Sequence, residues 1–286
     1  MRQDDRAPFD RALQLARVRA YAPGEFVGQE SFMTATEIRA LAERAGIGPG
    51  VDVLDVCCGI AGPGRFVTAE LGCDYLGVDA SASAVALARE RAGDLPCRFA
   101  VAQVPPLPDA SFDVVLLLET MLAFADKDAL LEAIAAALRP GGRFAFTLEE
   151  GAPLTSAERA AMPDADTVWL TPLDEIVAAA ERAGLAVAWV EDHSQAHRAT
   201  AQALAAAFAA DAAAITAQIG RGALDELLAA HRLWVRWLGE GRVRKLALVA
   251  ERADLAPKGR PRSAAFRSNV RCADGRRTAE GSRRAG

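Results

Sequence analysis

The stretch VLDVCCGIAGPGRFVTAELGCDYLGVDAS, residues 53–81, places two acids around a glycine-rich turn. Asp55 lies in an apolar segment four positions before Gly59, and Asp79 ends the next apolar segment. A strand, a glycine-rich turn, a helix and a second strand ending in an acid form the pattern of a nucleotide-binding βαβ unit. An acid at the end of the second strand is placed to accept hydrogen bonds from ribose hydroxyls. The stretch therefore predicts a site for a ligand that contains ribose.

The turn GIAGPG fits the dinucleotide pattern GxGxxG only if Ala61 takes the place of the second glycine. Asp55 argues against a dinucleotide, because a carboxylate pointing at the turn would repel a pyrophosphate and would suit an ammonium group. A ligand with a ribose, an ammonium group and no phosphate is S-adenosylmethionine, which we expect as the cofactor.

These residues need a sheet that brings the ends of several strands together. Apolar segments at 51–57, 75–79, 97–103, 112–118, 143–150, 185–191 and 242–250 indicate strands, with helical periodicity between them. Their alternation predicts an α/β fold with a doubly wound, mostly parallel seven-stranded sheet. Ligands of such sheets bind beyond the carboxyl ends of the strands.

Acids after the later strands are candidates for an acceptor site. Glu119 follows the fourth strand and would orient an amine or stabilise positive charge, although an acid there can also cap the next element. His193 and His197 lie four residues apart at the start of an Ala-rich helical block, and one of them is a candidate general base. Solvent-exposed or hydrogen-bonded histidines are the plainer interpretation, and we expect no metal there. His231 falls on an apolar helical stripe, which is typical of a core histidine.

Four segments resemble the class I S-adenosylmethionine-dependent methyltransferases in their order and spacing: VLDVCCGIAGPG, YLGVDAS, FDVVLLL and LRPGGRF. The resemblance covers about residues 24–249 and implies a Rossmann-like methyltransferase fold. It also implies that the residues in contact with the cofactor are Asp55, Gly59, Ala61, Gly64, Asp79, Ala80, Gln103, Val104 and Glu119. The family usually has an acid where Gln103 stands.

The segment YAPGEFVGQESFMTATE is similar to the lid of small-molecule members such as the glycine-derivative and phosphoethanolamine N-methyltransferases. The alternative is an aromatic-rich helix junction that only packs in the core. The lid and the strand ends together supply the residues that we expect around the acceptor: Tyr21, Phe26, Gln29, Thr120, Met121 and Glu149.

The chain divides into a helical N-terminal lid (1–45), a methyltransferase domain (46–250) with a helical insert (192–241) before the last strand, and a basic disordered tail (251–286). The tail carries ten basic and four acidic side chains, so the rest of the chain carries 23 basic and 34 acidic ones. This acidic body argues against a nucleic-acid partner. Five cysteines with no paired CxxC spacing argue against a disulfide framework and a structural zinc site.

The apolar runs are too short to span a bilayer and the N-terminus lacks a signal pattern, so we expect a cytoplasmic monomer or homodimer without a membrane partner. The expected function is methyl transfer from S-adenosylmethionine to a small molecule, with N-methylation preferred. The alternative is O- or C-methylation of a phenolic, quinone or other natural-product acceptor. An NAD-dependent oxidoreductase and a non-catalytic cofactor- or RNA-binding protein are the remaining hypotheses.

Overall fold

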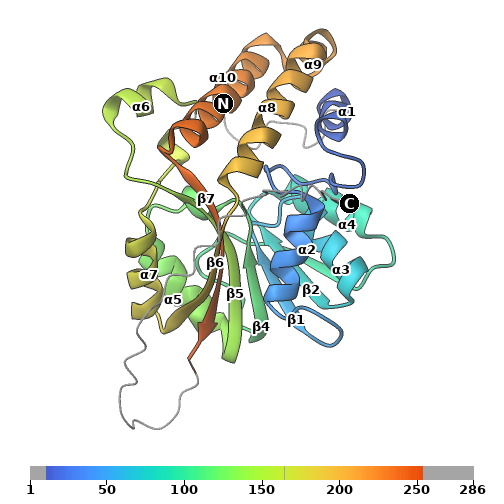
Figure 1. Cartoon of the computed structure of the whole chain (residues 1–286). Coiled ribbons are helices and arrows are strands. Elements are labelled where there is room, and N and C mark those ends of the chain that lie inside the picture. The colour runs from blue at the N-terminus through green and yellow to red at the C-terminus, as the bar shows by residue number, and fades with distance from the viewer. Residues whose placement is uncertain (1–10, 164, 254–286) are drawn as a thin grey trace, which may run out of the picture.

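The computed structural model describes residues 11–163 and 165–253, which contain a seven-stranded sheet in the order β3-β2-β1-β4-β5-β7-β6 (Figure 1). Neighbouring strands are parallel except around β7, which is antiparallel to both β5 and β6. The expected α/β class and mostly parallel sheet agree with this topology. The strands are β1 Asp52–Val56, β2 Asp74–Asp79, β3 Cys97–Val101, β4 Phe112–Leu117, β5 Leu138–Glu150, β6 Leu185–Asp192 and β7 Arg244–Arg252.

Helices cover both faces of the sheet, because successive residues of the central strands are buried on opposite sides. Val53 packs with α2, α3 and α4, whereas Leu54 packs with α5 and α7. Strands buried on both faces are apolar throughout, which explains the continuous runs in the sequence. These helices are α2 Ala35–Arg44, α3 Gly62–Leu71, α4 Ala82–Ala92, α5 Lys127–Ala137 and α7 Leu173–Arg182.

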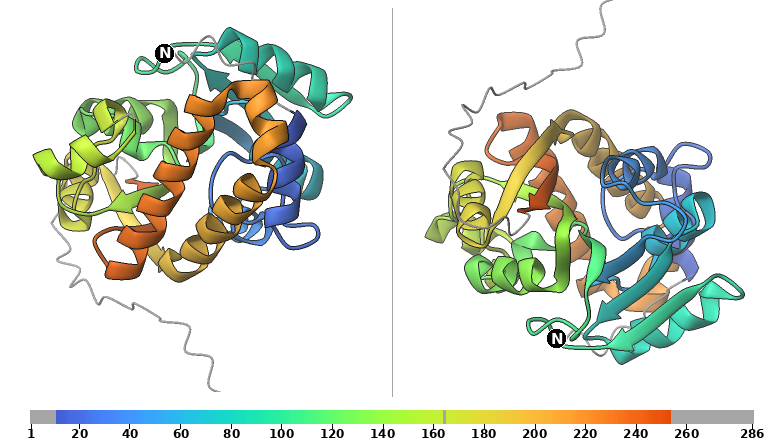
Figure 2. Two further views of the ribbon diagram at one scale, coloured as in Figure 1. Left: turned by 90° about the horizontal axis from the view of Figure 1, so that it is seen from above. Right: turned by 90° about the horizontal axis from the view of Figure 1, so that it is seen from below.

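A third group of helices lies over the end of the sheet at which β7 begins (Figures 1 and 2). It consists of α1 Arg11–Ala20, α8 Ser194–Ala210, α9 Ala212–Ile219 and α10 Arg221–Glu240. These helices share one apolar cluster with Tyr21 and Phe32. In the described residues no single helix is long and apolar enough to cross a bilayer; α8 and α9 pass that test together but bend by 82° at their break.

The structure changes several expected boundaries. In residues 11–45, the described part of the N-terminal region, α1 and α2 are the only helices, and residues 21–34 between them form an irregular segment, which we call the crossing segment. The strand expected at 143–150 is longer, because β5 already begins at Leu138, directly after α5. The start of the tail at residue 251 was wrong, because β7 pairs with β5 and β6 as far as Glu251 and Arg252. Residues 1–10 and 254–286 lie outside the described part of the chain.

The connection between β5 and α7 contains two short helices, α6 Ser156–Ala161 and η3 Ala165–Thr167, and a third, η2 Met121–Ala123, follows β4. Three helices, α8 to α10, stand between β6 and β7, where a short turn is enough to join an antiparallel pair. They bring the chain back over the carboxyl ends of the parallel strands, where the predicted site residues lie.

Candidate functional site

Asp79 fixes the glycine-rich turn after β1. Its Oδ2 accepts a hydrogen bond from the backbone N–H of Gly59 and its Oδ1 accepts one from Ser81, both at 2.8 Å. Each carboxylate oxygen keeps a further lone pair, and the side of Gly59 where a Cβ would stand is open, with no atom within 4 Å. The turn and Asp79 therefore leave space and acceptors for a ribose.

Asp55 lies below the turn and not in this open space. It is buried, and the Tyr75 hydroxyl donates a hydrogen bond of 2.5 Å to its Oδ2. Burial raises the pKa of Asp55 to about 7, against the lowering effect of this hydrogen bond. Gly64 makes the arrangement possible, because a Cβ there would stand 2.2 Å from Tyr75. In this structure Asp55 is thus buried and paired with Tyr75 of β2, whereas the sequence predicted that it would point at the turn and suit the ammonium group of the ligand.

The crossing segment contacts the turn directly. A Cβ on Gly62 would lie 2.5 Å from the carbonyl carbon and oxygen of Gly28, so the two backbones touch. Gln29 is buried within the crossing segment, where it accepts from the N–H of Val27 and donates to the carbonyls of Glu25 and Met33. Gln29 therefore shapes this segment, and it lines neither of the two cavities described below. Ala61, the residue before α3, has a left-handed backbone, at φ 55°.

A cavity of about 270 Å³ lies beyond the carboxyl ends of β4 and β5, and we call it the acceptor cavity. Its polar lining includes Glu119, Glu149 and Lys245, and its aromatic lining comes from the crossing segment and α10. The aromatic residues are Tyr21, Phe32, His231 and Trp234. Of the residues predicted around the acceptor, Tyr21 and Glu149 line this cavity, and so does Glu119.

Lys245 links the two glutamates. Its Nζ donates to Oε2 of Glu119 and to Oε1 of Glu149, each at 2.5 Å. Glu149 and Lys245 stand directly opposite each other on β5 and β7, which brings their side chains together. The Lys245 ammonium also lies 5.4 Å from the ring centre of Phe32 and 5.7 Å from that of Trp234. The two carboxylates and one ammonium carry one net negative charge.

Two oxygens of this cluster are buried and have no hydrogen-bond partner among the described residues: Oε1 of Glu119 and Oε2 of Glu149. Burial would raise the pKa of Glu119, but the Lys245 ammonium holds it below its usual range. Glu119 also adopts a left-handed backbone, at φ 57°, and its N–H donates to Oγ1 of Thr147. Such conformations are costly for residues other than glycine and cluster at functional sites.

His231 lines the acceptor cavity, although its place on an apolar stripe predicted a core residue. Its Nδ1 lies 2.8 Å from the carbonyl oxygen of Leu227, which only accepts, so Nδ1 carries a hydrogen. Burial lowers the pKa of His231. The neutral ring therefore keeps its lone pair on Nε2, which is the form of a general base.

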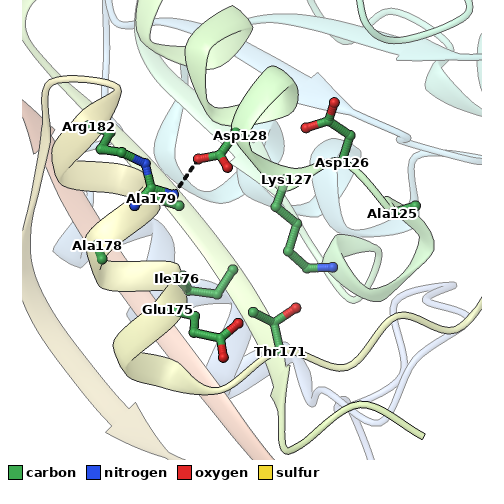
Figure 3. A pocket seen from close by; sticks show the side chains of 10 residues that line it. All are labelled: Ala125, Asp126, Lys127, Asp128, Thr171, Glu175, Ile176, Ala178, Ala179 and Arg182. Atoms are coloured by element: carbon green, nitrogen blue, oxygen red, sulfur yellow. Dashed lines mark hydrogen bonds and ion pairs between the residues drawn. The ribbon is translucent and has the colours of Figure 1, made fainter.

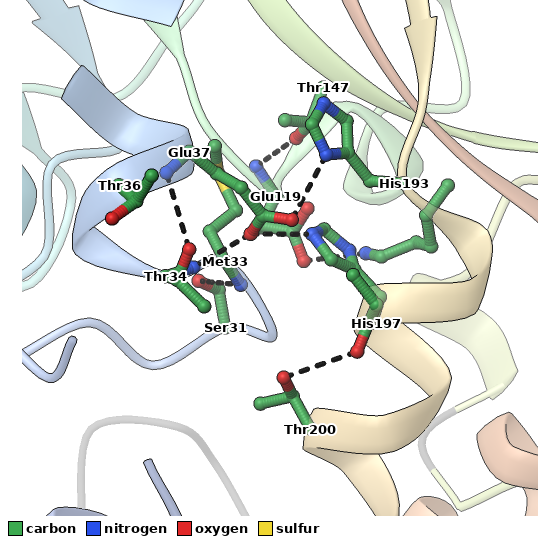
Figure 4. Close-up of polar contacts among 12 residues, drawn as sticks. Ser31, Met33, Thr34, Thr36, Glu37, Glu119, Thr147, His193, His197 and Thr200 are labelled. Atoms are coloured by element: carbon green, nitrogen blue, oxygen red, sulfur yellow. Dashed lines mark hydrogen bonds and ion pairs between the residues drawn. The ribbon is translucent and has the colours of Figure 1, made fainter. Parts of the chain in front are cut away.

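His193 and His197 lie beside the crossing segment and are not among the cavity-lining residues. Figure 4 shows both rings turned toward Glu37: Nδ1 of His193 is 3.0 Å from Oε1, and Nε2 of His197 is 3.3 Å from Oε2. Burial would raise the pKa of Glu37, but the two histidines hold it well below its usual range. Glu37 could not be predicted as their partner from local spacing, because it lies about 160 residues away in the chain.

The other predicted residues lie around these features. Phe26 packs on Tyr21, with ring centres 5.4 Å apart. Oγ1 of Thr120 donates to the carbonyl of Leu118, and Met121 is fully buried in the core, so neither lines the cavity. Exposed or half-buried positions just after β2 and β3 are taken by Ala80, Gln103 and Val104.

A second cavity, of about 610 Å³, lies between α5 and α7 (Figure 3). The Lys127 ammonium in its wall already donates to the carbonyls of Phe124 and Trp169. At its edge Arg182 pairs with Asp128. None of the predicted site residues lines this cavity, so we place the site at the turn and the acceptor cavity.

The fold and the turn with Asp79 together define a Rossmann-like domain of the methyltransferase type. Residues 54–146 match the family described as methyltransferase domain. The chain is 30% identical over 181 residues to methyltransferase GfsG of Streptomyces halstedii, covering 59% of this chain and 64% of GfsG. It is 36% identical over 109 residues to phosphoethanolamine N-methyltransferase 1 of Arabidopsis thaliana, covering 37% of this chain and 22% of that protein.

The fold is also similar to that of phosphoethanolamine N-methyltransferase 2 of Haemonchus contortus, solved with phosphomonomethylethanolamine and S-adenosylhomocysteine. The TM-score is 0.70 at 21% identity, and the match covers 84% of this chain and 57% of the other. Residues 54–146 are therefore a methyltransferase domain, in agreement with the class I S-adenosylmethionine-dependent methyltransferases that the motifs of the chain resemble. The chain spans less than two thirds of the length of each of these relatives.

Proposed function

We propose that this chain transfers a methyl group from S-adenosylmethionine to a small-molecule amine. The observation that carries the proposal is the pair of buried, unpartnered oxygens of Glu119 and Glu149, two residues that line the aromatic-rich acceptor cavity. Buried acceptors without a partner are costly, so a ligand that donates hydrogen bonds to them is favoured. The aromatic rings suit the apolar body or the positive charge of an amine.

The turn and Asp79 would hold the cofactor, with the carboxylate accepting from the ribose hydroxyls. When bound, S-adenosylmethionine supplies the methyl group at its sulfonium and leaves as S-adenosylhomocysteine. The crossing segment lies on the turn and also contributes Tyr21 and Phe32 to the acceptor cavity, so it would shield both parts of the site from water.

Glu119 and Glu149 would orient the acceptor nitrogen, and His231 would take its proton. An ammonium has no lone pair, so the acceptor must lose a proton before it attacks the methyl carbon, and Nε2 of neutral His231 is an acceptor for that proton. The net negative charge of the Glu119–Lys245–Glu149 cluster would stabilise the cationic acceptor. The protein thus supplies position and proton transfer.

His231 also supports a second candidate, O-methylation. A phenolic hydroxyl can donate to the same two carboxylate oxygens and lose its proton to the same imidazole. The two acceptor types differ in charge. The negatively charged cluster therefore attracts a protonated amine but not a neutral phenol.

A matched pair of acceptors tests the choice. The protein and S-adenosylmethionine would be incubated with a series of arylalkyl amines, such as phenethylamines, and with phenols of the same size. The methylated products would be measured by mass spectrometry. We expect the amines to turn over faster, and Glu149→Gln to reduce amine turnover more than phenol turnover. Methylation of phenols alone would contradict the amine proposal, and no S-adenosylhomocysteine with any acceptor would leave the proposed activity without support.

A further inference from the structure

Glu37, His193 and His197, which we call the Glu–His–His cluster, converge outside the acceptor cavity. Glu37 comes from the first turn of α2, His193 immediately precedes α8, and His197 lies one turn later. The exposed fractions of the three side chains are 12%, 16% and 3%. The cluster is therefore shielded from solvent and joins two elements that are distant in sequence.

The cluster has the geometry of a set of metal ligands. One ligand atom from each of the three residues lies within 4.8 Å of the others. An ion with bonds of about 2.0–2.2 Å to nitrogen and oxygen can therefore reach all three after small adjustments. The spacing of His193 and His197 puts both rings on one side of α8, with ring centres 5.7 Å apart and planes at 29°.

Thr34 orients the Glu37 ligand. Its N–H donates to Oε2 of Glu37 at 2.8 Å, and its Oγ1 accepts from the Glu37 N–H. The second ring nitrogen of His193 lies 3.9 Å from a carboxylate oxygen of Glu191, which is too far for a direct hydrogen bond. The second ring nitrogen of His197, Nδ1, is buried and has no hydrogen-bond partner among the described residues.

We propose that the Glu–His–His cluster binds a divalent transition-metal ion such as Zn²⁺. Two imidazoles and a carboxylate suit zinc and its neighbours better than magnesium or calcium, which prefer oxygen ligands. The ion would fasten α2, and the crossing segment that leads into it, to α8. Both contribute to the cover of the acceptor cavity through Phe32 and Leu204. The ion would therefore stabilise the closed cover.

Metal binding can be measured without any assay of methyl transfer. The full chain, freed of any polyhistidine tag and treated with a chelator, would be titrated with Co²⁺, whose visible absorption reports its ligands, and then with Zn²⁺ in competition. We expect one ion per chain and a rise in Tm on adding Zn²⁺. Loss of an outer-shell partner weakens metal sites about 10- to 100-fold, so loss of a direct ligand should weaken binding at least about tenfold.

Glu37→Gln is the sharpest variant, because glutamine can keep the capping box that Glu37 forms with Thr34 at the start of α2. We expect Glu37→Gln, His193→Ala and His197→Ala to lose the Co²⁺ spectrum and the Zn²⁺-induced rise in Tm. His231→Gln, which removes a histidine outside the cluster, should keep both. Absence of stoichiometric binding by the wild-type chain would overturn the proposal, as would unchanged binding in a folded Glu37→Gln variant.

Discussion

The Asp79 carboxylate is the residue on which cofactor binding should depend most. It accepts hydrogen bonds from Gly59 and Ser81 and is placed to accept from the ribose. We expect Asp79→Ala to weaken S-adenosylmethionine binding by about 1.5–3 kcal/mol, because charge-assisted hydrogen bonds to the ribose are lost. Calorimetry would measure this change. Asp74→Ala, at the exposed start of the same strand, should bind normally. Wild-type affinity of Asp79→Ala would remove Asp79 from the site.

His231 should determine how kcat falls at low pH, which is the acidic limb of the pH–rate profile. Burial lowers its pKa from the ordinary value of 6.5, and the base form is the active one, so kcat should fall only as the pH drops through that lowered pKa. His231→Gln should lower kcat about 10²- to 10⁴-fold, the usual contribution of a general base, and abolish this limb. A pH–rate profile of both proteins tests it. If His231→Gln showed the same fall in kcat at low pH as the wild type, another group would take the proton.

Asp55 should make stability depend on pH. With its pKa raised to about 7, the folded protein holds a proton between about pH 4 and pH 7 that the unfolded chain has released. The contribution of Asp55 to the free energy of unfolding is therefore greatest below its pKa in the unfolded chain and is lost as the pH rises through 7. For an isolated group the loss is about 1.4 kcal/mol for each unit by which the folded and unfolded pKa values differ. Urea unfolding at pH 5 and pH 8 should show a smaller difference for Asp55→Asn than for the wild type. An equal difference would show that Asp55 is ionised in the folded protein.

At the scale of elements, the contact between the crossing segment and the turn can be tested at Gly62. A methyl group there would meet the backbone of Gly28 at 2.5 Å and of Val27 at 2.7 Å, so the crossing segment must move. Overpacking of this kind typically costs about 1–3 kcal/mol. We expect Gly62→Ala to weaken S-adenosylmethionine binding and to raise its dissociation rate in stopped-flow measurements.

Gly48→Ala is the matched control, because a Cβ at Gly48 meets no atom within 4 Å. If Gly62→Ala binds and releases the cofactor as the wild type does, the crossing segment does not cover it.

The strands were predictable and the acceptor cavity was not, for a physical reason. Strands buried on both faces are continuous apolar runs, and the glycine-rich turn and Asp79 follow directly from local spacing. Lys245 meets Glu149 only through the register of β5 with β7, and Glu37 meets His197 across about 160 residues. No local pattern encodes either contact. His231 resembles a core residue because it packs against the rings of Phe32 and Phe208 while it also lines the cavity.

At the scale of the whole molecule, the uneven charge bears on what the chain binds. Residues 251–286 hold ten of its 33 basic side chains, and residues 1–250 are acidic. We expect deletion of residues 256–286, which leaves β7 intact, to keep kcat/KM for a small acceptor within about twofold, since no residue placed in the site is removed. The assay is methyl transfer by the shortened chain. Loss of activity with cofactor binding retained would place part of the acceptor site in the deleted segment.

The proposed methyl transfer to an amine can be tested with a crystal structure of the chain bound to S-adenosylhomocysteine and an amine acceptor. We expect the ribose hydroxyls on the Asp79 carboxylate, the thioether sulfur facing the acceptor cavity, and the acceptor nitrogen within hydrogen-bond distance of the free oxygens of Glu119 or Glu149. A nucleoside bound away from the glycine-rich turn, or a sulfur that protein atoms separate from the acceptor cavity, would contradict it.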